Sequence, residues 1–203
     1  MKRTIITTAV FAVSTGCAGL GQPNNLPQVK EALNTRPPPI SVPPADFPTE
    51  QLTAGERVFT VPVGYKLESV KPSNTATFYS VETRLERSNL KHSATLSVFP
   101  PNETATEAQV VGMASLYPVK EEWNARKTEL PGAKNAFYST RFLIVAEGVA
   151  TTGFSAATGI QHGADNLYVS CVTLSVGPMS VEAFVEAEQE CMRLSMALSS
   201  SPG

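Results

Sequence analysis

The chain has 203 residues, of which 16 are Lys or Arg and 18 are Asp or Glu, and its formal net charge is −2. This length predicts one domain of ordinary size with a tail. A charge so close to neutral argues against a nucleic-acid-binding protein, which would show a basic stripe, and we expect no nucleic-acid partner. A domain of this size buries about two-thirds of its surface on folding, so it needs no metal or other cofactor to fold, and none is expected.

The first residues have the pattern of a secretory signal. Lys2 and Arg3 precede an apolar run at residues 5–13, which is shorter than the about 20 residues needed to cross a bilayer. Two positive charges followed by a short apolar core are typical of a signal peptide. We therefore predict that residues 1–16 are a signal peptide and take no part in the fold.

The end of this segment resembles the lipobox of bacterial lipoproteins. Thr15 and Gly16 precede Cys17, while Ser14 stands where the family usually has Leu. In that family the cysteine is lipidated and becomes the first residue of the mature chain. The resemblance therefore implies lipidation at Cys17 and a membrane-lipid partner. The alternative is an ordinary signal peptide cut nearby, which would leave a secreted or soluble periplasmic protein with an incidental Cys17.

The resemblance also implies a location. The residue after Cys17 is Ala18 rather than Asp, which in Gram-negative lipoproteins implies the outer membrane, with the domain facing the periplasm. Each buried methylene of an acyl chain contributes about 0.8 kcal/mol, so several chains on one cysteine would hold the protein firmly. No later stretch approaches 18 consecutive apolar residues, so no other membrane-spanning segment is predicted.

Residues 17–50, which follow the signal peptide, are predicted to be a lipidated cysteine with a proline-rich tether. Half of the chain's 16 prolines lie here, with runs at residues 37–39 and 43–44. Such runs favour polyproline II and cannot join a helix interior or a central strand. Only one or two weak helical turns are expected, at residues 26–36. The segment would be a semi-rigid spacer that holds the domain off the membrane, or alternatively a proline-rich ligand for a partner.

Residues 51–203 are predicted to form a single α+β domain with an antiparallel sheet of about six to seven strands. Alternating apolar and polar residues predict strands at residues 57–63, 65–71, 76–87, 93–99, 137–147, 150–160 and 166–176. Helical spacing and capping residues predict helices at residues 105–117, 118–127 and 181–198. The mid-chain and C-terminal helices would pack on the sheet. The last strand has apolar residues on both faces, which predicts a central position.

The two cysteines of this domain, Cys171 and Cys191, are predicted to form a disulfide. Lipidation of Cys17 would leave them as an even pair, and an oxidising periplasm would allow the bond. Cys191 falls on the apolar face of the C-terminal helix and Cys171 lies in the last strand, so they can meet if the helix covers that face of the sheet. The alternative is two buried free cysteines.

The order of strands, helix, strands and helix resembles the PsbP and Mog1-like α+β architecture that occurs in some small exported lipoproteins. The closing strand–Pro–helix unit, from Leu167 to Leu198, carries the resemblance. It implies a fold, and a fold by itself implies no function.

Few residues suggest catalysis or metal binding. Ser88 and Lys91 fit the Ser-x-x-Lys motif of β-lactamases, but the motif is short and its companions are missing. Ser155, His162 and Asp165 are close in sequence, whereas a catalytic triad needs convergence in space. No second metal ligand stands at a suitable spacing from either histidine, so no metal site is predicted.

We therefore expect a non-catalytic envelope lipoprotein that binds an envelope protein or a cell-wall component. One alternative is a small envelope serine hydrolase that uses Ser155 or Ser88 with a base within about 3 Å. The other is a carrier of an apolar ligand, which would need a cavity of about 300 Å³ or more between sheet and helix.

Overall fold

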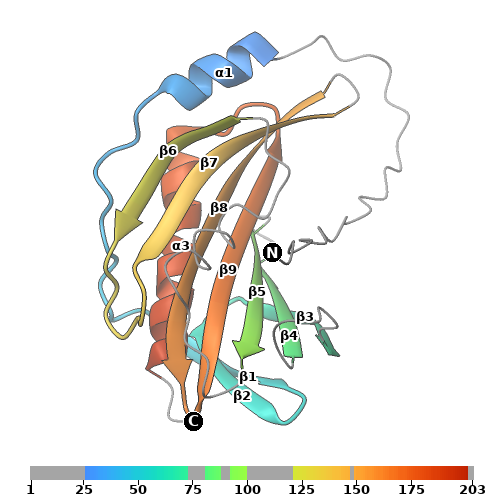
Figure 1. The fold of residues 1–203 in the computed structure, drawn as a ribbon, viewed down its shortest axis with the longest axis vertical. Helices are drawn as coiled ribbons and strands as arrows, with labels where there is room; N and C mark the ends of the chain where they lie inside the picture. The colour runs from blue at the N-terminus through green and yellow to red at the C-terminus, as the bar shows by residue number, and fades with distance from the viewer. Residues whose placement is uncertain (1–25, 73–80, 88–91, 100–120, 147–148, 201–203) are drawn as a thin grey trace, which may run out of the picture.

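The computed structural model describes residues 26–72, 81–87, 92–99, 121–146 and 149–200. These residues form an α+β fold, as predicted, in which a curved antiparallel sheet is covered by helices and a separate β-hairpin (Figure 1). Within the described part, the helices are α1 (Leu26–Asn34) and α3 (Val181–Ser199), and the strands are β1 (Thr49–Ala54), β2 (Arg57–Pro62), β3 (Lys66–Pro72), β4 (Val81–Arg87), β5 (His92–Phe99), β6 (Glu121–Thr128), β7 (Phe137–Ala146), β8 (Val149–His162) and β9 (Asp165–Val176).

The main sheet contains seven strands in the order β3-β4-β5-β9-β8-β7-β6, and each neighbouring pair is antiparallel. This confirms the predicted antiparallel sheet and the central position of the last strand, β9. β1 and β2 form an additional two-stranded hairpin, of which β1 was not predicted. The predicted helix at residues 105–117 lies outside the described residues.

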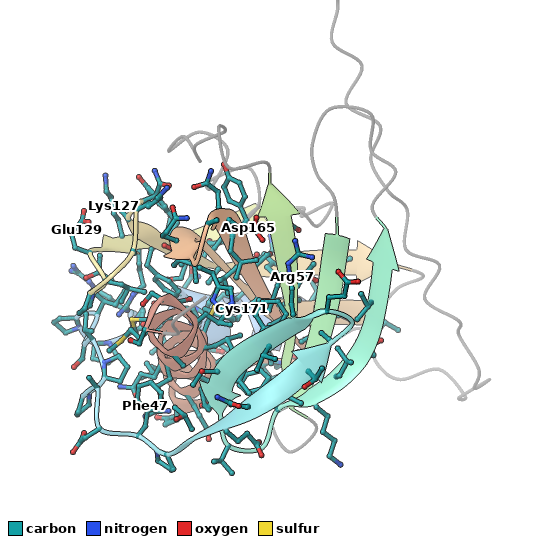
Figure 2. All side chains as sticks on the ribbon, turned by 90° about the horizontal axis from the view of Figure 1, so that it is seen from below. Phe47, Arg57, Lys127, Glu129, Asp165 and Cys171 are labelled. Atoms are coloured by element: carbon teal, nitrogen blue, oxygen red, sulfur yellow. A yellow bond between two sulfur atoms is a disulfide. The ribbon has the colours of Figure 1, made fainter. Side chains whose placement is uncertain are left out.

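The C-terminal helix α3 covers one face of the sheet. Its N-terminus is capped by Ser180, whose hydroxyl accepts a hydrogen bond from the backbone N–H of Ala183. Most of its apolar stripe is buried, including Phe184, whose ring meets Phe154 of β8 edge-on at 5.7 Å between centroids. α3 also packs against β2 of the hairpin (Figure 2). The hydrophobic core therefore lies between α3, the sheet and the hairpin.

The predicted helical segment at residues 118–127 is wrong where the structure describes it. Residues 121–128 form strand β6, which pairs with β7 at the edge of the sheet. The charge pattern of Arg126 and Lys127 suited a solvated helix face. In the strand, neighbouring side chains point to opposite faces, so Arg126 is directed toward α3 while Lys127 lies over the ring of Tyr138.

The described part of the predicted tether is also different from a free spacer. Residues 26–48, which we call the strap, lie against the domain. α1 packs at one end of the sheet, and the following chain runs past α3 to β1 (Figure 1). The apolar spacing of Val29 and Leu33 gives α1 a buried face, and Ile40 and Val42 pack against the main core. Apolar burial outweighs the proline-rich chain's tendency to stay extended in water.

Candidate functional site

Apolar contacts and two arginines hold the strap against the domain, and α1 makes part of the apolar contacts. Val29 and Leu33 are fully buried against Leu143 of β7 and Ala150 of β8. This small apolar cluster is separate from the main core. α1 is thus docked on the sheet by its own hydrophobic contacts.

Arg141 of β7 binds the C-terminal end of α1. Its guanidinium donates hydrogen bonds to the backbone carbonyls of Leu33 at 2.7 Å, Thr35 at 2.6 Å and Ala32 at 3.3 Å. The last carbonyls of a helix have no partner within the helix and carry partial negative charge. α1 has no basic residue in its last turn. Arg141, from a distant part of the sequence, supplies the positive charge that these carbonyls attract.

A second arginine binds the strap further along. Arg126 of β6 donates a 2.7 Å hydrogen bond to the carbonyl of Pro38 and forms an ion pair with Glu188 of α3, with 3.0 Å between Nε and Oε1. The guanidinium groups of Arg126 and Arg141 lie 5.6 and 5.3 Å from the centroid of the Phe184 ring, within the range of cation–π attraction. One aromatic ring therefore helps to position both arginines.

Glu188 is the buried anion of this cluster. It is only 1% exposed and accepts a 2.6 Å hydrogen bond from the hydroxyl of Ser139. Burial raises the pKa of its carboxyl, while Ser139 and Arg126 act in the opposite direction. Burial and the charge of Arg126 lower the pKa of Arg141. Glu188 therefore pairs with Arg126, whereas Arg141 is balanced by the carbonyl dipoles of the strap.

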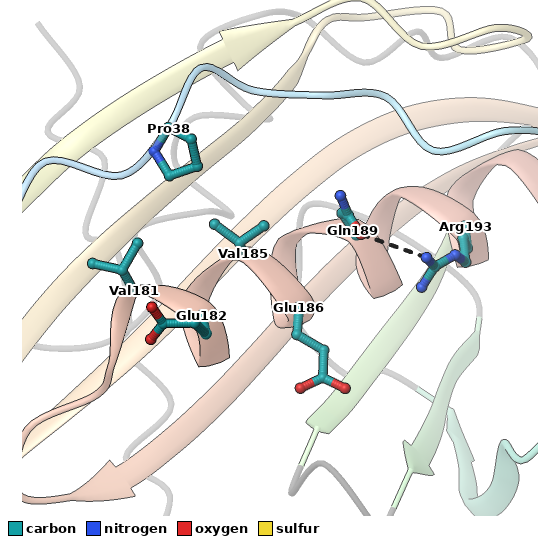
Figure 3. A pocket seen from close by; sticks show the side chains of 7 residues that line it. All are labelled: Pro38, Val181, Glu182, Val185, Glu186, Gln189 and Arg193. Atoms are coloured by element: carbon teal, nitrogen blue, oxygen red, sulfur yellow. Dashed lines mark hydrogen bonds between the residues drawn. The ribbon is translucent and has the colours of Figure 1, made fainter.

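A shallow groove runs between the strap and α3 (Figure 3). Its volume is about 540 Å³, and it is lined by Pro38, Val181, Glu182, Val185, Glu186, Gln189 and Arg193. The pKa of Glu182 is lowered by hydrogen bonds from its own backbone N–H and from Ser180 at the helix N-terminus. The lining holds no serine, cysteine or histidine, so the groove offers a mixed apolar and charged surface rather than a Ser or Cys nucleophile.

A second hollow of about 370 Å³ lies between the end of the strap and the last turn of α3, near Phe47 and Met196. Both hollows are on the surface, whereas the space between α3 and the sheet is filled by buried side chains such as Phe154 and Phe184. In the part of the chain that the structure describes, this packing gives no support to the carrier alternative, which needs a cavity between sheet and helix.

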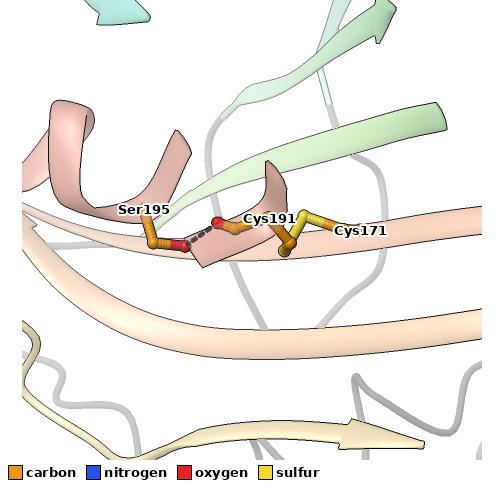
Figure 4. The surroundings of a disulfide bond; sticks show 3 residues. All are labelled: Cys171, Cys191 and Ser195. Carbon is orange, nitrogen blue, oxygen red and sulfur yellow. Dashed lines mark hydrogen bonds between the residues drawn. A yellow bond between two sulfur atoms is a disulfide. The ribbon is translucent and has the colours of Figure 1, made fainter. Parts of the chain in front are cut away.

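The predicted disulfide is present. Cys171 of β9 is bonded to Cys191 of α3, with 6.0 Å between their Cα atoms, and both residues are fully buried (Figure 4). Next to the bond, the hydroxyl of Ser195 donates to the carbonyl of Cys191. Helix α3 covers the Cys171 face of the sheet, which is the geometric condition stated for the bond. The lipidation site, Cys17, lies outside the described residues.

The residues of the possible catalytic triad do not come together. Ser155 and His162 are both in β8, seven positions apart, so their side chains point to opposite faces and their backbones are separated by about 23 Å. The imidazole Nδ1 of His162 lies 3.0 Å from the carbonyl of Leu198, and its ring packs on Phe59. Asp165 forms an ion pair with Arg57 at 3.1 Å. Ser88 lies outside the described residues.

Within residues 26–72, 81–87, 92–99, 121–146 and 149–200, no group of His, Cys, Asp and Glu side chains is arranged to hold a metal ion. Over the same ranges no helix combines the length and hydrophobicity needed to cross a bilayer.

Sequence reasoning missed the strap site and its arginines. A signal was present, because Arg141 is the one charged residue of the strand Phe137–Ala146, and a single charge in a strand under a helix calls for a buried partner. Its partners are backbone carbonyls more than 100 positions away, which no local pattern reveals.

Comparison with known proteins gives little further information. No known family model matches the sequence, and no curated protein has significant similarity to it. Among solved structures, the Ran-binding protein Mog1p of Saccharomyces cerevisiae is similar in fold, with 9% sequence identity and a TM-score of 0.43; the match covers 75% of this chain and 95% of that chain.

Proposed function

We propose that the protein is a lipoprotein of the bacterial envelope, anchored by acyl groups on Cys17, whose α+β domain is a binding or scaffolding module without catalytic activity. The domain would face the periplasm from the outer membrane and bind an envelope protein or a cell-wall component. The anchoring rests on the lipobox-like residues Thr15, Gly16 and Cys17 and on the signal-like segment before them.

The observation that carries the proposal is the buried bond between Cys171 and Cys191. Disulfides persist in oxidising compartments such as the periplasm and are rare in the bacterial cytosol. The chain has three cysteines, so this bond leaves Cys17 as the remaining thiol. Export and a dedicated role for Cys17 are therefore supported by two independent features of the chain.

The non-catalytic role is supported by the distance between the candidate catalytic groups. Ser155 and His162 lie on opposite faces of β8, and Asp165 is engaged with Arg57. The well-developed polar cluster of Arg126, Arg141 and Glu188 binds a segment of the same chain. These residues act in folding and assembly of the domain.

The anchoring is tested by comparing two variants in a Gram-negative host. Cys17→Ser removes the acceptor thiol, so we expect loss of radiolabelled palmitate incorporation and release of the protein from the membrane fraction or retention of its signal peptide. Ser14→Leu restores the usual lipobox residue and is the matched control, which should incorporate at least as much palmitate as the natural sequence. Equal incorporation by Cys17→Ser and the natural sequence would contradict the proposal.

A further inference from the structure

The docked strap shortens the connection between the proposed anchor and the domain. The strap begins at Leu26, and eight residues, 18–25, lie between it and Cys17. An extended chain spans at most about 3.5 Å per residue, so Cα of Leu26 is at most about 30 Å from Cα of Cys17. If the chain were free as far as Thr49, the same estimate would allow about 110 Å.

The contacts that hold the strap set this limit. Val29 and Leu33 are fully buried, Arg141 binds the carbonyls at the end of α1, and Arg126 binds the carbonyl of Pro38. Hydrogen bonds to a charged donor contribute more than those between neutral groups. Because apolar burial and two arginines act together, the chain from the anchor joins the domain at α1 rather than at β1.

α1 and the β1–β2 hairpin lie at opposite ends of the long axis of the molecule (Figure 1). Val149 marks the α1 end, since it is 41% exposed and precedes Ala150, which packs on α1. Glu56, which is exposed in the turn between β1 and β2, marks the other end. A short connection at one end of an elongated domain restricts which end can approach the bilayer.

We propose that the strap orients the domain on the membrane, with the α1 end facing the lipid surface within about 30 Å and the β1–β2 hairpin pointing away from it. This inference rests on the proposed lipidation of Cys17. The partner of the α1 end is a phospholipid surface, and the hairpin end is left accessible to components at a distance from the bilayer.

The test uses energy transfer from the full-length lipidated protein to the bilayer. A donor dye is attached through an azido-phenylalanine introduced at Val149 or at Glu56, which spares the disulfide. The protein is reconstituted in vesicles of phosphatidylethanolamine and phosphatidylglycerol that carry an acceptor on the lipid headgroups. We expect transfer from position 149 to be at least twofold that from position 56. Equal transfer, or more from position 56, would overturn the inference.

A spacer insertion tests the role of the short connection without changing the folded domain. A flexible chain has a root-mean-square span of about 5–6 Å times the square root of its length, so 40 Gly and Ser residues inserted after Gln22 would raise the span from about 16 Å to about 38 Å. Transfer from position 149 should then fall to the level of position 56. The same insertion after Gly203 is the control and should change neither value. Unchanged transfer after the first insertion would overturn the inference.

Flotation of the vesicles separates this inference from the proposed function. A protein that does not float with the vesicles lacks the lipid anchor, and both proposals then fail. A protein that floats but shows no difference between positions 149 and 56 keeps its anchor, and only the orientation is then wrong.

Discussion

The guanidinium of Arg141 lies 2.7 Å from the carbonyl oxygen of Leu33, a residue 108 positions earlier in the chain. This contact joins the sheet to a segment whose composition predicted a semi-rigid spacer. Arg141 is fully buried, so its charge must be compensated in place. The compensation comes from the C-terminal carbonyls of α1, which makes the strap a structural part of the domain.

Arg141→Ala should release the strap. Loss of the charged donor leaves several carbonyls without a partner, and we expect the free energy of unfolding to fall by about 2–4 kcal/mol. Arg141→Lys should retain only part of the stability that Arg141 provides, since an ammonium group cannot present the planar fork that reaches several carbonyls. Limited proteolysis with thermolysin measures strap release directly, because its preferred sites Val29 and Leu33 are buried in the natural protein. If Arg141→Ala resists thermolysin at these two sites as well as the natural protein does, Arg141 does not hold the strap in place.

Replacing both disulfide cysteines should lower stability. In the chain-entropy treatment, a bond that closes a loop with a sequence separation of 20 contributes about 3 kcal/mol. For a domain of this size, we expect Cys171→Ala combined with Cys191→Ala to lower Tm by about 6–12 °C. The reduced natural protein is the matched comparison and should behave like the double variant. Free thiols at Cys171 and Cys191 in the natural protein, detected by alkylation under denaturing conditions without reductant, would show that the bond does not form.

Glu188 should make stability depend on pH. Burial raises the pKa of its carboxyl above the ordinary range of a glutamate, so the folded protein binds this proton more tightly than the unfolded protein does. The resulting contribution to stability is fully present below the unfolded pKa and is lost as pH rises through the higher folded pKa. The positive group that faces it is Arg126, at 3.0 Å.

Glu188→Gln removes this titration. The free energy of unfolding of the variant, minus that of the natural protein, should therefore increase as pH rises from about 4 to about 8. Urea unfolding at several pH values measures the difference. Asp165→Asn, at an ion pair far from the cluster, is a suitable comparison. A difference for Glu188→Gln that stays constant over this range would contradict the raised pKa.

Gly153 is required by a close approach of an aromatic ring. A Cβ atom at this position would collide with the ring of Phe142 on the neighbouring strand. Phe142 is fully buried and cannot move aside freely, so Gly153→Ala should cost about 1–3 kcal/mol or more. Adding Phe142→Leu should recover part of the loss, as expected for residues in direct contact. Thermal unfolding of the two single variants and the double variant measures this coupling. If the stability losses of the two single variants simply add in the double variant, the predicted contact is wrong.

The sequence was sufficient for elements whose own residues define them. The alternation in β4, β5, β7, β8 and β9 and the capped apolar stripe of α3 led to correct element types, with ends shifted by a few residues. The disulfide was predicted from the even pair of cysteines that lipidation of Cys17 would leave, on the condition that the helix covers the Cys171 face, and the structure contains it. In each case a local period determines which side chains are buried.

Long-range contacts explain what could not be predicted. β6 resembled a charged helix because the buried partner of Arg126, Glu188, is more than 60 positions away. The strap resembled a spacer because prolines dominate its composition, although Val29 and Leu33 already had the spacing of a buried helix face. Tertiary contacts overrode the local preference in both segments.

The proposed anchoring of the protein by acyl groups on Cys17 has one decisive measurement, which is mass spectrometry of the N-terminal peptide of protein purified from its native host. We expect a mature chain that begins at Cys17 and carries a diacylglyceryl group on its thiol. A chain that begins at another residue, or one in which Cys17 carries no lipid, would contradict it.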